Sequence, residues 1–346
     1  MAIVNQRQGD SESRPDKPGA TRRRQNEHGR FGHDLVEVAD GVFAYLQPDG
    51  TWGWSNAGLV AGRGESVLVD TLFDLCLTRT MLDEMAPVTG TSPITQVLNT
   101  HANGDHCYGN QLVAGPGVDI IASAAASAEM DEVPPAMVEG AGDDILGEFI
   151  THAFGSFEFG GIEPVEVTVE FSGRHEVDAG GRQVEMIEVG PAHTAGDVIA
   201  WLPEELVVFT GDILFKDGTP IMWSGPVANW IAALDRIAEL EPEVVVPGHG
   251  PLTDAAGTRA QRDYLALLAE LTTGHHEAGV SLESATRAID AHIDQTPYAE
   301  WSDRERIVVN VLSIWRELEP SFEPPDVLGV FQLMAEHHRA SRATQA

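Results

Sequence analysis

The segment 101–106 concentrates side chains that can do chemistry, because it places two imidazoles, a carboxylate and a carboxamide within six positions. These side chains belong to His101, Asn103, Asp105 and His106. Four such groups in a core would each need a hydrogen-bonding partner. The apolar run 94–98 directly before them is predicted to be a strand, and a strand end that delivers these groups into one turn is typical of half a metal site.

The other half is expected downstream, because a metal cage draws ligands from several loops that meet at one end of a scaffold. Three more apolar, strand-like runs, at 184–189, 206–210 and 244–246, each lead into a glycine followed within a few positions by a histidine or an aspartate. The residues so placed are His193, Asp212 and His249. Their repeated position indicates strand ends arranged around one cation.

This ordered set of motifs resembles the metallo-β-lactamase fold superfamily over about residues 41–253. The family's first motif is His-x-His-x-Asp-His, which here reads His101-x-Asn103-x-Asp105-His106. The resemblance implies an α/β (α+β) fold, the αββα sandwich of two mixed β-sheets packed face to face and flanked by helices. It also implies a metal centre at one edge of that sandwich.

The resemblance also implies roles for single residues. One metal site would comprise His101, position 103 and His193, and the other Asp105, His106 and His249, with Asp212 bridging the two. In true β-lactamases the bridging residue is usually a cysteine. With an aspartate at this position the chain resembles instead the branches of the family that hold two metals, such as lactonases, glyoxalase-type thioesterases, sulfatases and phosphodiesterases. One or two divalent transition metals per chain are therefore expected, first Zn²⁺, with Mn²⁺ or Fe²⁺ as alternatives.

Asn103 departs from the family motif. A neutral amide oxygen is a weaker ligand than an imidazole nitrogen for a borderline metal such as Zn²⁺ and suits harder ions better. The first site is therefore predicted to bind metal less tightly than the second. A single metal in the second site, with Asp105 partly free to act as a base, is the alternative.

A divalent metal lowers the pKa of a bound water from about 15.7 to about 7, so such a cage predicts hydrolysis without a serine or cysteine nucleophile. Asp105 and Asp212 are the predicted catalytic residues, because either carboxylate can orient the water and pass a proton to the leaving group. Asp70 and Asp197 are predicted to support the ligand loops. Thr71 is expected to cap the following helix.

Composition limits the substrate. The 54 acidic and 21 basic residues give a net charge of −33, which repels polyanions and argues against nucleic-acid partners. Tryptophans in the loop 48–56 and in the segment 220–223 predict apolar pocket walls beside a polar metal floor. The predicted substrate-binding residues are Trp52, Trp54, Met222 and Trp223, although packing against one another or against a neighbouring subunit is an equal alternative for each tryptophan.

The rest of the chain predicts three parts: a disordered polar arm at 1–30, a catalytic domain at 31–254 and a helical C-terminal extension at 255–346. Strands are expected at 42–46, 58–60 and 66–69, and helices at 74–85, 255–273, 282–292, 303–318 and 327–339, with Ser281 and Ser302 as N-caps. The extension is expected to form a lid or an oligomer contact, in a homo-oligomer or with a related subunit.

Two cysteines, no apolar stretch of membrane-spanning length and no convincing export signal predict a cytoplasmic protein without a membrane partner.

These observations predict a metal-dependent hydrolase of a small neutral or aromatic ester, lactone, thioester or ether. Two alternatives keep the fold and change the reaction: a polyketide cyclase of the same fold, and an aryl methyl ether hydrolase, that is, an O-demethylase. A non-enzymatic alternative is a degenerate metal-binding partner subunit. Asn103 favours that last alternative, and the six intact ligand positions oppose it.

Overall fold

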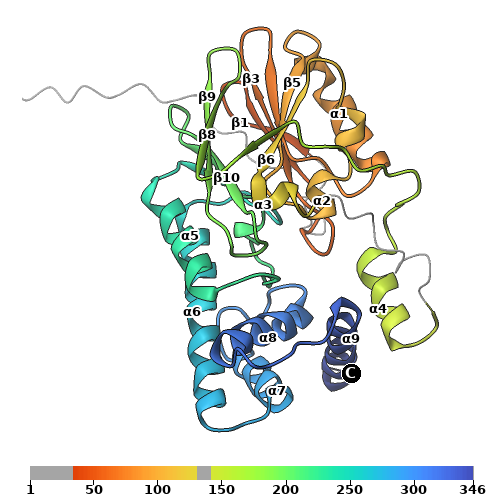
Figure 1. Cartoon of the computed structure of the whole chain (residues 1–346), viewed down its shortest axis with the longest axis vertical. Helices are drawn as coiled ribbons and strands as arrows, with labels where there is room; N and C mark the ends of the chain where they lie inside the picture. The colour runs from red at the N-terminus through yellow and green to blue at the C-terminus, as the bar shows by residue number, and fades with distance from the viewer. Residues whose placement is uncertain (1–33, 131–141, 346) are drawn as a thin grey trace, which may run out of the picture.

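The computed structural model describes residues 34–130 and 142–345, so the predicted polar arm at 1–30 lies outside the described residues. Two β-sheets pack face to face, and helices cover their outer faces (Figure 1). This arrangement confirms the sandwich expected from the sequence.

Seven strands form the first sheet in the order β1-β2-β3-β4-β5-β6-β7. Neighbours from β1 to β4 pair antiparallel, and neighbours from β4 to β7 pair parallel. The strands are β1 Asp34–Ala39, β2 Val42–Leu46, β3 Ala57–Ala61, β4 Ser66–Val69, β5 Ile94–Leu98, β6 Asp119–Ser123 and β7 Val169–Phe171.

Five strands form the second sheet in the order β12-β11-β10-β9-β8, with β11 and β12 parallel and the other pairs antiparallel. They are β8 Arg174–Asp178, β9 Gln183–Glu188, β10 Val198–Leu202, β11 Val207–Phe209 and β12 Val244–Val246. β10 is buried along its whole length, as expected for a continuous apolar run covered on both faces.

Apolar side chains fill three layers of the sandwich. Between the sheets, residues such as Val42 and Val67 of the first sheet meet Val184 and Val198 of the second. On the outer face of the first sheet, Met81 and its neighbours in α1 (Leu75–Thr89) pack on β3 to β6. α5 (Val227–Glu239) covers the second sheet with a buried stripe at helical spacing.

Helices after β12 form the extension, which lies at one end of the sandwich in Figure 1. They are α6 Ala255–Glu277, α7 Leu282–Ile293, η3 Arg304–Arg306, α8 Ile307–Leu318 and α9 Val327–Gln345. α4 (Ile145–Phe154), inserted between β6 and β7, packs against α9. One apolar cluster joins α4, α5 and the extension, so the core continues across the predicted boundary at residue 254.

Two of the expected helix caps need correction. Ser281 does cap α7, since its hydroxyl accepts from the Ser284 N–H. The residue before η3 is Asp303, in the left-handed region at φ 52°, so Ser302 is not the cap that the sequence suggested. α1 is capped by Asp74, whereas the Thr71 hydroxyl donates to Asn110 Oδ1. No helix within the described part of the chain is both long and apolar enough to cross a membrane.

Candidate metal centre

The predicted ligands come from four loops that follow strands of the two facing sheets. His101 follows β5, and Asp105 and His106 lie in the short helix α2 (Gly104–Cys107). His193 lies in the connection between β9 and β10, Asp212 in η2 (Gly211–Ile213) after β11, and His249 after β12. Because the two sheets face each other, these strand ends meet at one edge of the sandwich.

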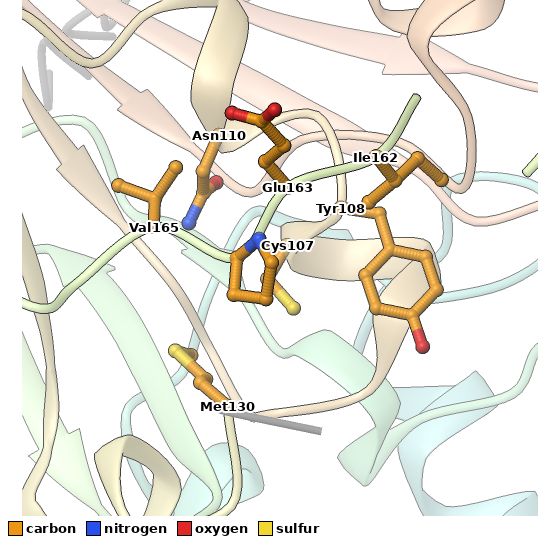
Figure 2. A pocket seen from close by; sticks show the side chains of 8 residues that line it. Cys107, Tyr108, Asn110, Met130, Ile162, Glu163 and Val165 are labelled. Atoms are coloured by element: carbon orange, nitrogen blue, oxygen red, sulfur yellow. The ribbon is translucent and has the colours of Figure 1, made fainter. Parts of the chain in front are cut away.

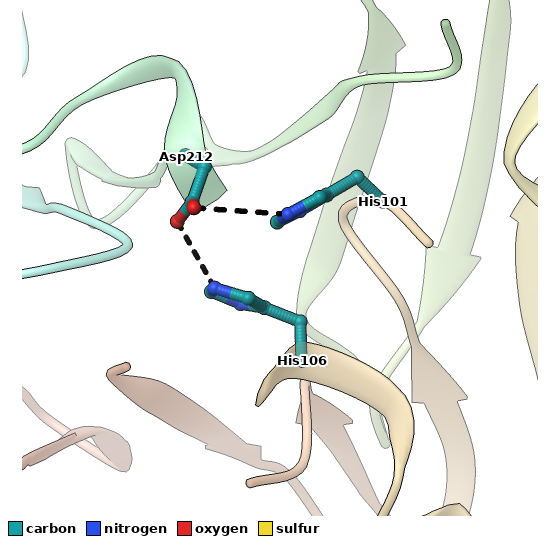
Figure 3. Close-up of side chains that lie close together, drawn as sticks. All are labelled: His101, His106 and Asp212. Atoms are coloured by element: carbon teal, nitrogen blue, oxygen red, sulfur yellow. Dashed lines mark ion pairs between the residues drawn. The ribbon is translucent and has the colours of Figure 1, made fainter. Parts of the chain in front are cut away.

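Asp212 stands at the centre of four imidazoles. Its Oδ1 lies 3.0 Å from His106 Nε2. Its Oδ2 lies 3.4 Å from His193 Nε2, 3.5 Å from His249 Nε2 and 3.8 Å from His101 Nε2. Figure 3 shows His101 and His106 pointing at this carboxylate from different elements. The arrangement is the one expected of a carboxylate that bridges two groups of ligands.

Asp105 faces the same centre from α2. Its Oδ2 lies 3.2 Å from His249 Nε2, and Asp105, His106 and His249 offer ligand atoms within 4.8 Å of one another. His101, His106 and Asp212 form a second such group. Imidazole nitrogens and carboxylate oxygens are the donors that Zn²⁺ and its first-row neighbours take.

Buried polar atoms in this cluster lack partners that a metal would supply. His101 Nε2 is buried with no hydrogen-bond partner, and His106 Nε2 and Asp212 Oδ1 are buried with no hydrogen bond beyond their own ion-pair contact at 3.0 Å. Such atoms are costly inside a protein unless an ion or water satisfies them. The donor set and these unsatisfied atoms therefore fit a divalent cation.

The electrostatics of the cluster also favour positive charge. Burial disfavours the charged form of His106, yet the carboxylates of Asp212, Asp70 and Asp105 outweigh burial and raise its pKa well above the usual value. Burial likewise opposes ionisation of Asp212, but His249 and His106 hold the pKa of this carboxyl well below its usual range. A cation at this place would satisfy the same carboxylates.

Asp70 supports the ligand loop, as the sequence predicted. The carboxylate lies 2.8 Å from His106 Nδ1 and accepts from the Thr100 N–H at 2.7 Å and hydroxyl at 2.8 Å. This contact fixes the ring of His106 with Nε2 aimed at Asp212. Hydrogen bonds of this kind orient metal ligands and set their tautomer.

Asp197 supports the loop that carries His193 by binding backbone N–H groups of that loop, and it does not contact the imidazole. Its carboxylate accepts from the Ala192 N–H and from the N–H and hydroxyl of Thr194. Burial raises its pKa to about 7. His193 Nδ1 instead donates to the Ile221 carbonyl at 2.6 Å.

Asn103 lies beside His193. Its Nδ2 is 3.2 Å from His193 Nε2, and its side chain is half-buried. Asn103 occupies the N-cap position of α2, but its side chain makes no capping bond. The amide is therefore turned toward the cluster rather than used to finish the helix.

The four predicted substrate contacts fall into two classes. Trp52 and Met222 are buried, and the Trp52 indole N–H donates to Glu305 at 2.8 Å. Trp54 and Trp223 are only half-buried, with Trp54 against Phe157 and Trp223 against Phe331 of α9. A substrate contact stays a prediction for all four, and exposure favours Trp54 and Trp223.

The loop that carries Trp52 and Trp54 lies directly against the cluster. Ser55 forms a β-bridge with His249. Asn56 Nδ2 donates to the carbonyls of Pro247 and Gly250, on either side of the same ligand. A Cβ on Gly50 would come within 2.3 Å of the Gly250 nitrogen, so this close approach requires glycine.

Several supporting contacts escaped sequence reasoning. Phe215 stacks on His249, with ring centroids 5.0 Å apart and planes 8° from parallel. Arg306 lies over the Trp52 ring at 4.3 Å. Of these residues, Asn310 could have been identified from the sequence. It is a polar amide in the apolar run 307–315, and such a group needs a buried hydrogen-bonding partner.

Two cavities of the described chain differ greatly in size. Behind α2, Cys107, Tyr108 and Met130 help line a cavity of about 10 Å³, room for about one water (Figure 2). A larger cavity of about 320 Å³ lies between α4 and α9, with Phe149, His152 and His338 in its wall. His338 also lies 3.2 Å from Glu305, which holds Trp52.

Comparison with known sequences gives one family. Residues 50–249, more than half of the chain, match the family model described as Metallo-beta-lactamase superfamily. The chain is 33% identical over 79 residues to Beta-lactamase-like protein 2 homolog of Caenorhabditis elegans, which covers 23% of this chain and 26% of that protein. It is 25% identical over 151 residues to Hydroxyacylglutathione hydrolase of Methylococcus capsulatus, covering 43% and 45%. The chain thus spans less than half the length of these two relatives.

Solved structures show the same fold. A stereoselective inverting sec-alkylsulfatase from Pseudomonas sp. superposes with a TM-score of 0.63 at 16% identity, over 84% of this chain and 52% of that one. A metallo-beta-lactamase from Pontibacter korlensis gives a TM-score of 0.51 at 19% identity, over 67% and 98%. At these identities the likeness concerns the fold alone.

Proposed function

The chain belongs to the metallo-β-lactamase superfamily, and from this membership and the geometry of its histidine–carboxylate cluster we propose that it is a metal-dependent hydrolase of a small, largely neutral or aromatic molecule. The observation that carries the proposal is the position of Asp212, one carboxylate within 3.0–3.8 Å of four imidazole nitrogens. Buried polar atoms without hydrogen-bond partners in the same cluster support a cation there.

The residues divide into two proposed sets of ligands. His101, Asn103 and His193 would hold one metal, and Asp105, His106 and His249 the other, with Asp212 shared. When bound, a divalent metal supplies an acidified water and polarises the bond to be cleaved. Zn²⁺ suits the imidazole-rich set of ligands, and the amide oxygen of Asn103 is also a suitable ligand for Mn²⁺ or Fe²⁺.

The protein's own groups have three proposed tasks. Asp105 or Asp212 holds the proton released by the attacking water and delivers it to the leaving group. Asp70 keeps His106 in one orientation throughout, so that no reorganisation is needed during the reaction. Trp54 and Trp223 offer partly exposed aromatic surface at the side of the cluster.

The net charge of the chain limits the classes of substrate that we propose. A net charge of −33 opposes polyanions at long range, so nucleic acids and phosphodiesters are expected to be poor substrates. The relatives named Hydroxyacylglutathione hydrolase place acyl-glutathiones among the compounds to test. Lactones, simple esters, thioesters and aryl ethers complete the proposed set.

Metal analysis followed by a hydrolysis screen tests the proposal. Protein expressed with ample metal is expected to carry one to two transition metals per chain and to hydrolyse a member of the proposed set faster than a phosphodiester. His106→Ala should lose the metal and the activity, whereas His292→Ala, at an exposed position of α7, should keep both. Metal content near zero in the wild type would overturn the proposal and favour a degenerate subunit.

A further inference from the structure

One residue of α8 links the helical extension to a backbone segment that contacts the metal centre. Asn310 is fully buried, and both ends of its carboxamide contact the backbone around Ile221. Its Nδ2 donates to the Pro220 carbonyl at 2.7 Å, and its Oδ1 accepts from the Met222 N–H at 2.8 Å. We call the backbone segment 219–225 the strap.

The strap in turn holds His193. The Ile221 carbonyl accepts from His193 Nδ1 at 2.6 Å, and the N–H groups of Trp223 and Ser224 donate to the His193 carbonyl at 3.0 and 3.1 Å. Both the imidazole and the backbone of this ligand therefore depend on the strap. The Nδ1–H bond leaves Nε2 without a proton and directed at Asp212, 3.4 Å away.

Asn310 acts on the peptide unit that contacts His193. The Ile221 carbonyl and the Met222 N–H belong to the same planar group, so a hydrogen bond that fixes the N–H also fixes the direction of the carbonyl. Without Asn310 this peptide could rotate, and the proton on His193 would no longer be tied to Nδ1.

Neighbouring residues hold the two ends of the strap. Arg306, directly before α8, donates from Nη1 to the Thr219 carbonyl at 3.1 Å. Glu317 at the other end of α8 accepts from the Val227 N–H at 2.8 Å, just past the strap. These contacts attach the strap and the residue just past it to the extension along α8, with Asn310 between them in the first turn of the helix.

We propose that Asn310 is a positioning residue of the metal centre, so that the helical extension shapes the ligand set and is more than a cover or a contact surface. The proposal rests on the proposed function, because it needs a metal held by His193. It assigns to α8 a task that the loops of the sandwich perform elsewhere, as Asn56 does for the backbone around His249.

Metal affinity of the full-length protein tests this proposal. Asn310→Leu removes both hydrogen bonds at similar volume, and Asn310→Asp keeps the acceptor for the Met222 N–H but loses the donor to Pro220. Titration with Co²⁺ against a competing chelator is expected to show affinity reduced roughly 10- to 100-fold in Asn310→Leu, as for other residues that orient metal ligands. Asn310→Asp should lose less, and the visible spectrum of bound Co²⁺ should change in both.

Val311→Ala is the matched control, because Val311 is a fully buried apolar residue of the same helix. It should lower the melting temperature without changing Co²⁺ affinity or spectrum. Wild-type affinity and spectrum in a folded Asn310→Leu would overturn the proposal, as would an equal loss of affinity in Val311→Ala. If Asn310→Leu does not fold, Asn310→Asp decides by the same criteria. Failure of the wild type to bind Co²⁺ would instead contradict the proposed function itself.

Discussion

His106 Nδ1 lies 2.8 Å from Asp70 Oδ2, and this contact joins a metal-ligand candidate to the end of the central strand β4. Asp70 adopts the left-handed region at φ 62°, which a side chain of this type tolerates better than most. The backbone turn there aims the carboxylate at both Thr100 and His106. One residue thus fixes the orientation of the loop that carries the first motif.

Asp70→Asn should weaken metal binding roughly 10- to 100-fold, because it removes the negative charge behind His106 while keeping the shape and the left-handed backbone. Chelator competition measures the effect. Asp217→Asn is the control, since Asp217 is exposed and shares the same backbone region at φ 63°. Equal affinity in both variants would show that Asp70 only shapes the loop.

Asn103→Ala should change only the more weakly held metal, because a neutral amide is a poorer ligand than the imidazoles around it. Removal of metal by a chelator is expected to occur in two phases in the wild type. Asn103→Ala should affect the fast phase and Asn103→His should slow it, whereas His249→Ala should remove the tightly held metal. Loss of all metal in Asn103→Ala would contradict a weak first site.

Asp212→Asn should reduce turnover by several powers of ten, since the variant keeps the volume but loses the charge shared by four imidazoles. Asp212→Ala should be at least as damaging. Steady-state kinetics on the best substrate of the screen measure the effect. Activity within a few-fold of the wild type would exclude a bridging role for this carboxylate.

Trp54→Ala and Trp223→Ala should each lower kcat/KM for an aromatic substrate roughly tenfold, if each ring contributes about 1–1.5 kcal/mol of contact. Trp301→Ala is the control, because Trp301 is also half-buried but packs on Tyr264 and Tyr298 of the extension. A similar decrease in all three variants would indicate loss of packing and not of substrate contact.

Glu305→Gln should destabilise the fold at pH 7 by about 1–3 kcal/mol, because the buried carboxylate accepts from Trp52 and pairs with His338. Burial opposes ionisation of Glu305, but these two hydrogen bonds outweigh it and hold its pKa below the ordinary value of 4.5. A depressed pKa in the folded state gives stability that is present above the unfolded pKa and lost as pH falls through the folded one.

The difference between wild type and Glu305→Gln should therefore shrink as pH drops below about 4.5. Urea unfolding at several pH values measures it. Glu283→Gln, at a position of α7 where the side chain is 78% exposed, should have little effect at any pH. A difference that stays constant down to pH 3 would mean that shape rather than charge makes Glu305 important.

The sequence by itself determined the fold and the polar residues of the cluster. Apolar runs of strand length, and runs followed by a glycine and a histidine or aspartate, are local patterns. Such patterns can be recognised from the sequence without knowledge of the tertiary structure. Apolar runs of strand length are the reason that β2 and β4 appear with the predicted bounds. The glycine pattern marked His193, Asp212 and His249, and the closely spaced polar residues at 101–106 marked His101. The support given by Asp70 followed from its place at a strand end.

Only the tertiary structure decided which groups far along the chain hold those ligands and which tryptophans remain partly exposed. The contact of Asn310 with the strap spans 88 positions between Met222 and Asn310, and that of Trp52 with Glu305 spans 253. No spacing rule connects such partners, because they meet through the packing of the extension and α4 against the sandwich. The burial of Trp52 and the half-burial of Trp54, two positions along the same loop, also depend on that packing.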